Sequence, residues 1–261
     1  MKKYLIVVLE IFLIACSGGD DISVDLIEGP DDLLEGYRII FKDDFSQNSL
    51  NRGNWNTSLW WGRSNLGNLE AQWYIDNAFS VNNGILSIIA SRSQDLVLSN
   101  DFDYTSGVIT THQKTSFTYG KVIVRAKVPK GQGLWPALWL LPSSQGWPPE
   151  IDLMETIGGS VVYFTYHWGS NKDSHEQENT SIFVQNLTDD FHVYELDWEE
   201  NQIIWSFDGV EVFRTSENVP QEEMYFIANL AVGGKWPGYP DSTTVFPSRF
   251  DIDYVKIYQR E

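Results

Sequence analysis

The 261-residue sequence predicts a single all-β domain, a sandwich or a barrel of many short strands. Three observations support this fold class. Apolar and polar residues alternate along several segments, Asn-Gly and Asp-Gly pairs separate apolar runs, and no stretch shows a long apolar period of ~3.6 residues. Hydrophobic residues make up 42% of the chain, which is typical of a globular domain with a substantial core.

The N-terminal residues resemble an export signal. Lys2 and Lys3 precede an apolar run that ends at Ala15 and is too short to span a membrane comfortably. The run closes with Leu-Ile-Ala-Cys, which is similar to the bacterial lipoprotein box, whose cysteine becomes the lipidated first residue. We expect a lipoprotein signal peptide over residues 1–15 and lipidation of Cys16, with an ordinary signal peptide as the alternative. Cys16 is the only cysteine, which excludes disulfides and a thiolate metal cluster.

Residues 16–36 are expected to be a flexible acidic tether, because they are punctuated by Gly and Pro and show no amphipathic period. The start of this segment resembles the surface-export signal of Bacteroidetes lipoproteins. We therefore predict a cell-envelope lipoprotein of the outer membrane, displayed at the surface and attached to the membrane only through its lipid. The folded domain is expected over residues 37–261.

Alternating strands follow within this domain. Around residue 124 and around residue 252, apolar side chains are expected on the core face and charged ones on the other face. The core-facing sets are Val122, Val124, Ala126 and Val128, and Phe250, Ile252 and Tyr254; the outward sets are Lys121, Arg125 and Lys127, and Asp251 and Asp253. Asn83-Gly84 and Asp208-Gly209 each separate two such runs, which predicts two type I′ hairpins.

Charge and aromatic content narrow the partners. The net charge of −18 disfavours binding to nucleic acid phosphates, so a neutral partner fits best. The chain contains 11 Trp, a residue that fills cores and also forms flat platforms for sugar rings. Core packing accounts for part of this number, and a carbohydrate partner for the remainder.

The segment Glu-Ile-Asp-Leu-Met-Glu at residues 150–155 is the candidate catalytic strand. Glu150 and Asp152 share one face of a regular strand, whereas strict alternation would turn Glu155 into the core, where an unpaired carboxyl group is costly. A β-bulge near Leu153-Met154 returns Glu155 to the acidic face. Neighbouring carboxylates raise one another's pKa, so one can stay protonated while another is ionised. A retaining glycosidase needs this combination of an ionised nucleophile and a protonated acid. Taken alone, the segment also fits a solvated acidic strand or a calcium site.

The surrounding motifs resemble family sixteen of the glycoside hydrolases, in particular its laminarinase-like branch. They are GQGLWPALWLLP at 131–142, WPPEIDLME at 147–155, FTYG at 117–120, NLAVGGKWPG at 229–238 and DYVKIY at 253–258. The resemblance covers about residues 38–258. It implies a β-jelly-roll sandwich of two antiparallel sheets with an open concave substrate cleft. It also implies that Glu150 is the nucleophile, Asp152 the assisting carboxylate and Glu155 the acid/base.

The resemblance further implies sugar contacts. They are Trp135, Trp139, His167, Asn68 and Trp236, with Asn65 as a competitor for the role of Asn68 and with core packing as the alternative for the tryptophans. Trp60 and Trp61 are candidates for the wall of the negative subsites. His112, His175 and His192 are expected to be structural.

Catalysis in this family needs no cofactor, although some relatives carry a structural calcium on the convex side. Asp44, Gly84 and Asp253 match its ligands. Asp44 stands where relatives usually have Glu, and its shorter reach puts calcium binding in doubt.

The expected function is therefore an endo-acting, retaining hydrolase of internal β-1,3 or mixed β-1,3/1,4 glucan linkages, active as a monomer on a neutral polysaccharide. One alternative keeps the mechanism but changes the substrate to β-galactans or mucin-type glycans. Another is a non-catalytic surface glycan-binding protein, which is expected to lose one of the carboxylates that this chain keeps.

Overall fold

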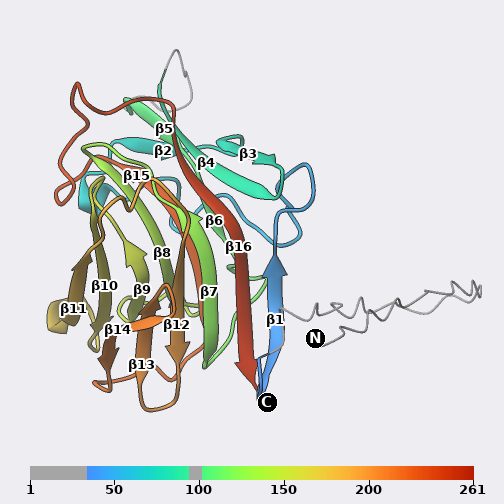
Figure 1. Cartoon of the computed structure of the whole chain (residues 1–261). Coiled ribbons are helices and arrows are strands. Elements are labelled where there is room, and N and C mark those ends of the chain that lie inside the picture. The colour runs from blue at the N-terminus through green and yellow to red at the C-terminus, as the bar shows by residue number, and fades with distance from the viewer. Residues whose placement is uncertain (1–33, 94–101) are drawn as a thin grey trace, which may run out of the picture.

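A computed structural model describes residues 34–93 and 102–261 (Figure 1). The predicted signal peptide, Cys16 and all but the end of the predicted tether lie outside the described residues. Two short 3₁₀ turns are present, η2 (Leu66–Asn68) and η3 (Lys172–Ser174), and the strands are β1 (Tyr37–Asp43), β2 (Gln72–Tyr74), β3 (Phe79–Asn82), β4 (Ile85–Arg92), β5 (Tyr104–Ser106), β6 (Val108–Thr110), β7 (Gly120–Lys127), β8 (Leu134–Pro142), β9 (Glu150–Glu155), β10 (Val161–Trp168), β11 (Glu176–Phe183), β12 (His192–Trp198), β13 (Ile203–Phe207), β14 (Val210–Thr215), β15 (Met224–Val232) and β16 (Ser248–Arg260).

The strands form two sheets. One is ten-stranded, ordered β14-β13-β12-β7-β16-β4-β5-β2, with β1 paired to β16 and β3 to β4; the other is six-stranded, ordered β11-β10-β9-β8-β15-β6. The predicted all-β sandwich is confirmed. The pairing is antiparallel throughout the named strands except between β2 and β5, which run parallel. Within the described ranges, no helix has the length and apolar character needed to cross a membrane.

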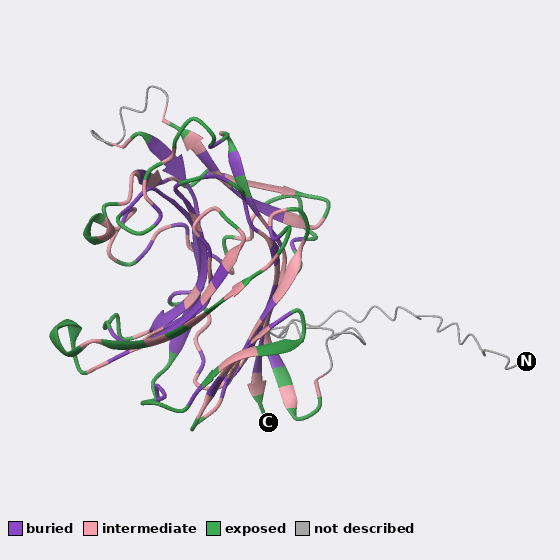
Figure 2. Ribbon diagram, turned by 60° about the vertical axis from the view of Figure 1, so that its left-hand side comes forward, coloured by how far each residue is buried: buried purple, intermediate pink, exposed green. Residues whose placement is uncertain are grey.

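The core lies between the two sheets, where Figure 2 shows buried residues on both. Along β7, Val122, Val124 and Ala126 are buried and the residues between them are not, as the period of two predicts. Trp55, Trp198 and Trp205 are among the largest fully buried side chains, so part of the tryptophan content does serve the core.

The prediction for the last strand is wrong at one residue. Phe250 and Ile252 are buried as expected, but Tyr254 is not, and Val255 is buried in its place. The register between β16 and β7 shifts between Ile252 and Tyr254, so Asp253 is an extra residue on β16. Such a β-bulge reverses the faces that follow it.

Both predicted hairpins are confirmed. Asn83-Gly84 joins β3 to β4 with φ angles of 51° and 75°, and Asp208-Gly209 joins β13 to β14 with φ angles of 48° and 76°. Two consecutive positive φ angles define a type I′ turn, which Asn, Asp and Gly tolerate best.

Candidate active site

The bulge in β9 is present and lies at Leu153. On the β8 side, Trp139 pairs with Asp152 and the next pair is Leu138 with Met154, so Leu153 has no partner. On the β10 side the register shifts within the same span. Leu153 and Met154 are both buried, and Glu155 returns to the face that carries Glu150 and Asp152. The three carboxyl groups therefore line one cleft on the six-stranded sheet.

Burial raises the pKa of each of these carboxyl groups to about 8. For Glu150 and Glu155 the charge of Asp152 adds to the rise. Asp152 is the most enclosed of the three, with 3% of its surface exposed, and desolvation alone accounts for its shift. Groups this close share their protons, so the cluster holds at least one proton near neutral pH.

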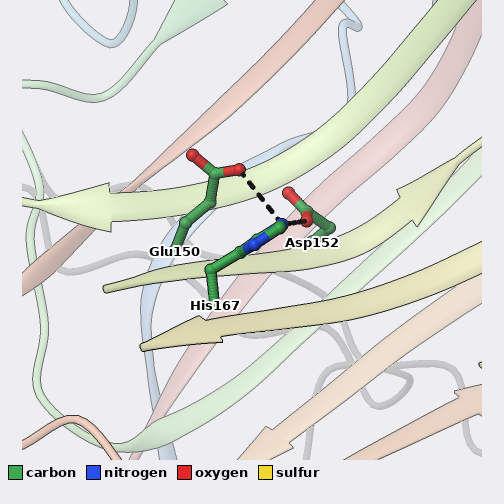
Figure 3. Close-up of side chains that lie close together, drawn as sticks. All are labelled: Glu150, Asp152 and His167. Carbon is green, nitrogen blue, oxygen red and sulfur yellow. Dashed lines mark ion pairs between the residues drawn. The ribbon is translucent and has the colours of Figure 1, made fainter. Parts of the chain in front are cut away.

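His167 on β10 faces two of the carboxyl groups (Figure 3). Its Nε2 lies 3.2 Å from Oδ2 of Asp152 and 3.7 Å from Oε1 of Glu150. Its Cα is the cross-strand partner of Glu150, so pairing of β9 with β10 creates this contact. The ligand atoms of these three residues lie within 4.8 Å of one another, a spacing that a metal ion also accepts.

Two tryptophan indoles donate hydrogen bonds to the two outer carboxyl groups. Trp147 Nε1 donates to Oε2 of Glu150 at 3.0 Å, and Trp135 Nε1 donates to Oε1 of Glu155 at 2.9 Å. Glu150 therefore has an indole N–H on one oxygen and His167 near the other, and both contacts partly offset the rise of its pKa.

The cleft extends to both sides of β9. One half contains Trp61, Trp135 and Trp139, and the other contains Trp135, Trp147 and Trp236; Glu150 and Glu155 lie at the junction and line both halves. Trp135 and Trp139 lie four residues apart on β8, and both line the cleft. An open cleft with aromatic walls on both sides of the carboxyl groups suits a chain that continues in both directions.

The loop tryptophan is part of the same wall. Trp236 contacts Trp135 edge to face at 5.4 Å and Tyr163 at 4.8 Å between ring centroids, and 42% of its surface is exposed. In the other half, Trp61 packs on Trp139 at 6.3 Å, with Trp60 standing edge-on against Trp61.

Asn68 and Asn65 both reach the cleft, and their positions differ. Asn65 caps the η2 turn, where its side chain accepts a hydrogen bond from the backbone of Gly67. Asn68 lines both halves of the cleft, and its Nδ2 donates to Oε1 of Glu70 at 3.2 Å. Glu70 also accepts from Gln72 at 2.6 Å, and burial raises its pKa. The structure therefore favours Asn68 for the sugar contact, held in place by Glu70.

Comparison with known proteins identifies the family. The model of the glycosyl hydrolases of family 16 matches residues 68–256. The chain belongs to this family. An endo-1,3-1,4-beta-glycanase of Rhizobium meliloti is 37% identical over 84% of this chain and 51% of its own length. A beta-glucanase of Rhodothermus marinus is 33% identical over 85% of each chain.

A solved family 16 structure shares the fold. The laminarinase catalytic domain of Thermotoga maritima superposes with a TM-score of 0.79 at 33% identity, over 87% of this chain and 100% of that domain. The jelly-roll architecture expected from the sequence is thereby confirmed. The chain spans about half the length of the first curated relatives it matches.

The three residues that this family 16 member would use to bind calcium come from neighbouring segments of the backbone. Their side chains fit the ion only in part. A Cβ on Gly84 would lie 3.7 Å from the carbonyl oxygen of Asp44, and Asp253 lies where β1 and β4 meet β16. However, the carboxylate of Asp253 is ion-paired with Arg125, which a calcium ion would have to displace. Calcium at this position stays a prediction.

Sequence reasoning missed several residues of this family 16 site. His175, expected to be structural in isolation, contacts His167 directly, with 2.8 Å between the two ring nitrogens. Gln177 and Asn179 line the cleft beside His167, because they are paired with His167 and Thr165 across β10 and β11. The sequence shows that these two side chains lie on one face of β11. It does not show which strand pairs with β11.

Proposed function

We propose that this protein is an endo-acting, retaining β-glycanase that cleaves β-1,3 or mixed β-1,3/1,4 glucan. The observation that carries this proposal is the convergence of Glu150 and Glu155 at the middle of an aromatic cleft. Burial and the charge of Asp152 raise the pKa of both Glu150 and Glu155 to about 8, so the pair can hold one proton between them near neutral pH. Retaining hydrolysis requires one ionised and one protonated carboxyl group, and we assign the nucleophile to Glu150 and the acid/base to Glu155, as the resemblance implies.

The chemistry follows in two steps. Glu150 attacks the anomeric carbon while Glu155 protonates the glycosidic oxygen, which leaves with its part of the chain. Glu155, now ionised, then takes a proton from water, and the water oxygen displaces Glu150 from the anomeric carbon. Asp152 and His167 hold the nucleophile in place, and Trp135 holds the acid/base.

The lining of the cleft favours an uncharged substrate. Of the described residues that line its two halves, the ionisable ones are carboxylic acids, tyrosines and His167, and none is Lys or Arg. Sulfated or carboxylated sugars would meet negative charge without a compensating cation. A neutral glucan is therefore the favoured polymer, in agreement with the names of the Rhizobium endo-1,3-1,4-beta-glycanase and the Rhodothermus beta-glucanase.

A substrate screen tests the proposal. Purified protein is incubated with laminarin, barley glucan, agarose and mucin, and products are followed by chromatography with time. We expect oligosaccharides of several lengths from laminarin or barley glucan at early times, as endo cleavage produces, and none from the Glu150→Gln variant. Products from agarose or mucin alone would redirect the proposal to galactans, and activity of Glu150→Gln equal to wild type would refute the mechanism.

We also propose that the protein is a monomeric lipoprotein anchored through Cys16. The support is the basic pair, short apolar run and Leu-Ile-Ala-Cys sequence at the N-terminus. Radiolabelled palmitate should be incorporated into the full-length chain expressed in a bacterial host, and Cys16→Ser should abolish the label. Sedimentation of the domain without residues 1–16 should give the mass of one chain.

A further inference from the structure

His175 reaches the catalytic cluster from outside the strands that carry it. It follows the η3 turn between β10 and β11, and its Nε2 lies 2.8 Å from Nδ1 of His167. The angle between the two ring planes is 29°, and the ring centroids are 5.0 Å apart. His167 therefore uses both of its ring nitrogens: Nε2 faces Asp152 and Glu150, and Nδ1 meets His175.

The loop that carries His175 is built to turn back onto β10. Gly169 has a φ of 138°, and a Cβ at this position would lie 2.4 Å from the carbonyl oxygen of Ser174, so only glycine allows this close return. The side chain of Asn171 accepts hydrogen bonds from the backbone of Asp173 and Ser174, which closes the turn.

Trp147 holds the other side of His175. The two rings lie 4.8 Å apart and 36° from parallel. The same indole donates to Oε2 of Glu150. The contacts therefore form a closed ring through Glu150, Trp147, His175 and His167. A shift of His175 would reach Glu150 by two routes, one through Trp147 and one through His167.

The hydrogen bonds set the direction of the contact between the two imidazoles. Oδ2 of Asp152 is buried and has no hydrogen-bond partner among the described residues, and Nε2 of His167 lies 3.2 Å from it and 3.7 Å from Oε1 of Glu150. Whichever of these two carboxyl groups is ionised needs a hydrogen on that nitrogen. In a neutral His167 the Nδ1 atom is then an acceptor, so Nε2 of His175 must be the donor.

We propose that His175 is a positioning residue: by donating from Nε2 to Nδ1 of His167, it holds the Nε2–H of His167 toward Asp152 and Glu150. A neutral His175 suits this role, and burial lowers its pKa. The consequence for catalysis rests on the proposed glycanase function, whereas the tautomer of His167 does not depend on it.

Kinetics of two variants test the catalytic consequence. His175→Ala should lower kcat about tenfold with little change in KM, because the nucleophile is misplaced while the sugar platforms are intact. His175→Gln should recover most of the activity, since its amide also donates a hydrogen bond. His192→Gln is the matched control, because His192 pairs with Asp208 on the other sheet. Equal losses in the Ala and Gln variants, or wild-type kcat in both, would overturn the proposal.

Nitrogen-15 spectra of labelled histidine test the contact independently of activity. Wild-type protein should show His167 with a protonated Nε2 and an accepting Nδ1, and His175→Ala should change the Nδ1 resonance. His192→Gln should leave it unchanged. If no substrate is cleaved but the resonance shifts as expected, the glycanase proposal fails while the tautomer assignment survives; an unchanged resonance in His175→Ala overturns the role of His175 directly.

Discussion

The indole Nε1 of Trp205 donates a hydrogen bond, 2.9 Å long, to the backbone carbonyl oxygen of Asp152. Trp205 is fully buried on β13 of the ten-stranded sheet, so the bond crosses the sandwich to the catalytic strand. The bulge at Leu153 follows Asp152 immediately. A bulge disrupts the ladder of backbone hydrogen bonds, and Trp205 supplies a donor to one carbonyl group at that point.

Replacing Trp205 by Phe should therefore destabilise the fold and the active site together. The change keeps an aromatic ring in the core but leaves the Asp152 carbonyl without this donor, at a cost of about 1–3 kcal/mol in the free energy of unfolding. Urea unfolding followed by fluorescence measures the cost, and kcat should fall as well. Trp198→Phe is a control, because its indole donates to Pro220 instead. A stability and a kcat equal to wild type in Trp205→Phe would contradict this role.

The roles of Glu150 and Glu155 can be separated by azide rescue on an aryl β-glycoside, whose leaving group needs no protonation. In Glu155→Ala, Glu150 still forms the covalent intermediate, and azide, which needs no base, attacks the anomeric carbon and displaces Glu150 to give a β-glycosyl azide. In Glu150→Ala, azide takes the place of the nucleophile and gives the α-azide. Proton NMR of the products distinguishes the two anomers, and the reverse pattern would exchange the two assignments.

The carboxyl cluster should make the protein less stable as the pH rises. Folded pKa values of about 8 lie above unfolded values near ~4, so the folded state binds these protons more tightly. The contribution to stability is full below pH ~4 and is lost progressively up to about pH 8. Glu150→Gln should therefore raise the Tm relative to wild type at pH 8 but not at pH 4. The rise should be about 2–4 °C for each kcal/mol gained in the free energy of unfolding.

Calorimetry across this pH range measures the difference. Glu176→Gln, an exposed residue on β11, is the control and should match wild type at both ends. A Tm of Glu150→Gln that stays below wild type at pH 8 would show that burial does not penalise the ionised nucleophile.

Asn229 orients Trp139, one of the proposed sugar platforms. Its Oδ1 accepts from Nε1 of Trp139 at 2.8 Å, and its Nδ2 donates to the hydroxyl of Tyr74 at 3.0 Å. Asn229→Ala leaves both partners without this contact in a buried place, so we expect a loss of about 1–3 kcal/mol in stability. KM should rise more than kcat falls, because Trp139 loses its orientation. Tyr74→Phe keeps the bond to Trp139, and a KM as poor as that of Asn229→Ala would refute the explanation.

The sequence by itself predicted an all-β domain, the two hairpins and the face that Glu150 shares with Asp152. These features are local: a period of two places side chains on opposite faces, and Asn-Gly or Asp-Gly accepts positive φ angles. The bulge near Leu153 was also predictable, because without it Glu155 would be buried among apolar residues. The same local logic failed at Tyr254, where the bulged residue is Asp253 and its carboxylate has an ion-pair partner in Arg125.

Only the tertiary structure decided what surrounds the catalytic strand. The donor from Trp205 comes from 53 residues away on the opposite sheet, and His175 arrives through a loop whose return depends on Gly169. Neither contact follows from spacing in the chain, because each depends on which strands become neighbours and on where a loop closes. The sequence placed three carboxyl groups on one face; packing between the sheets and the loop beside β10 determined which groups hold them there.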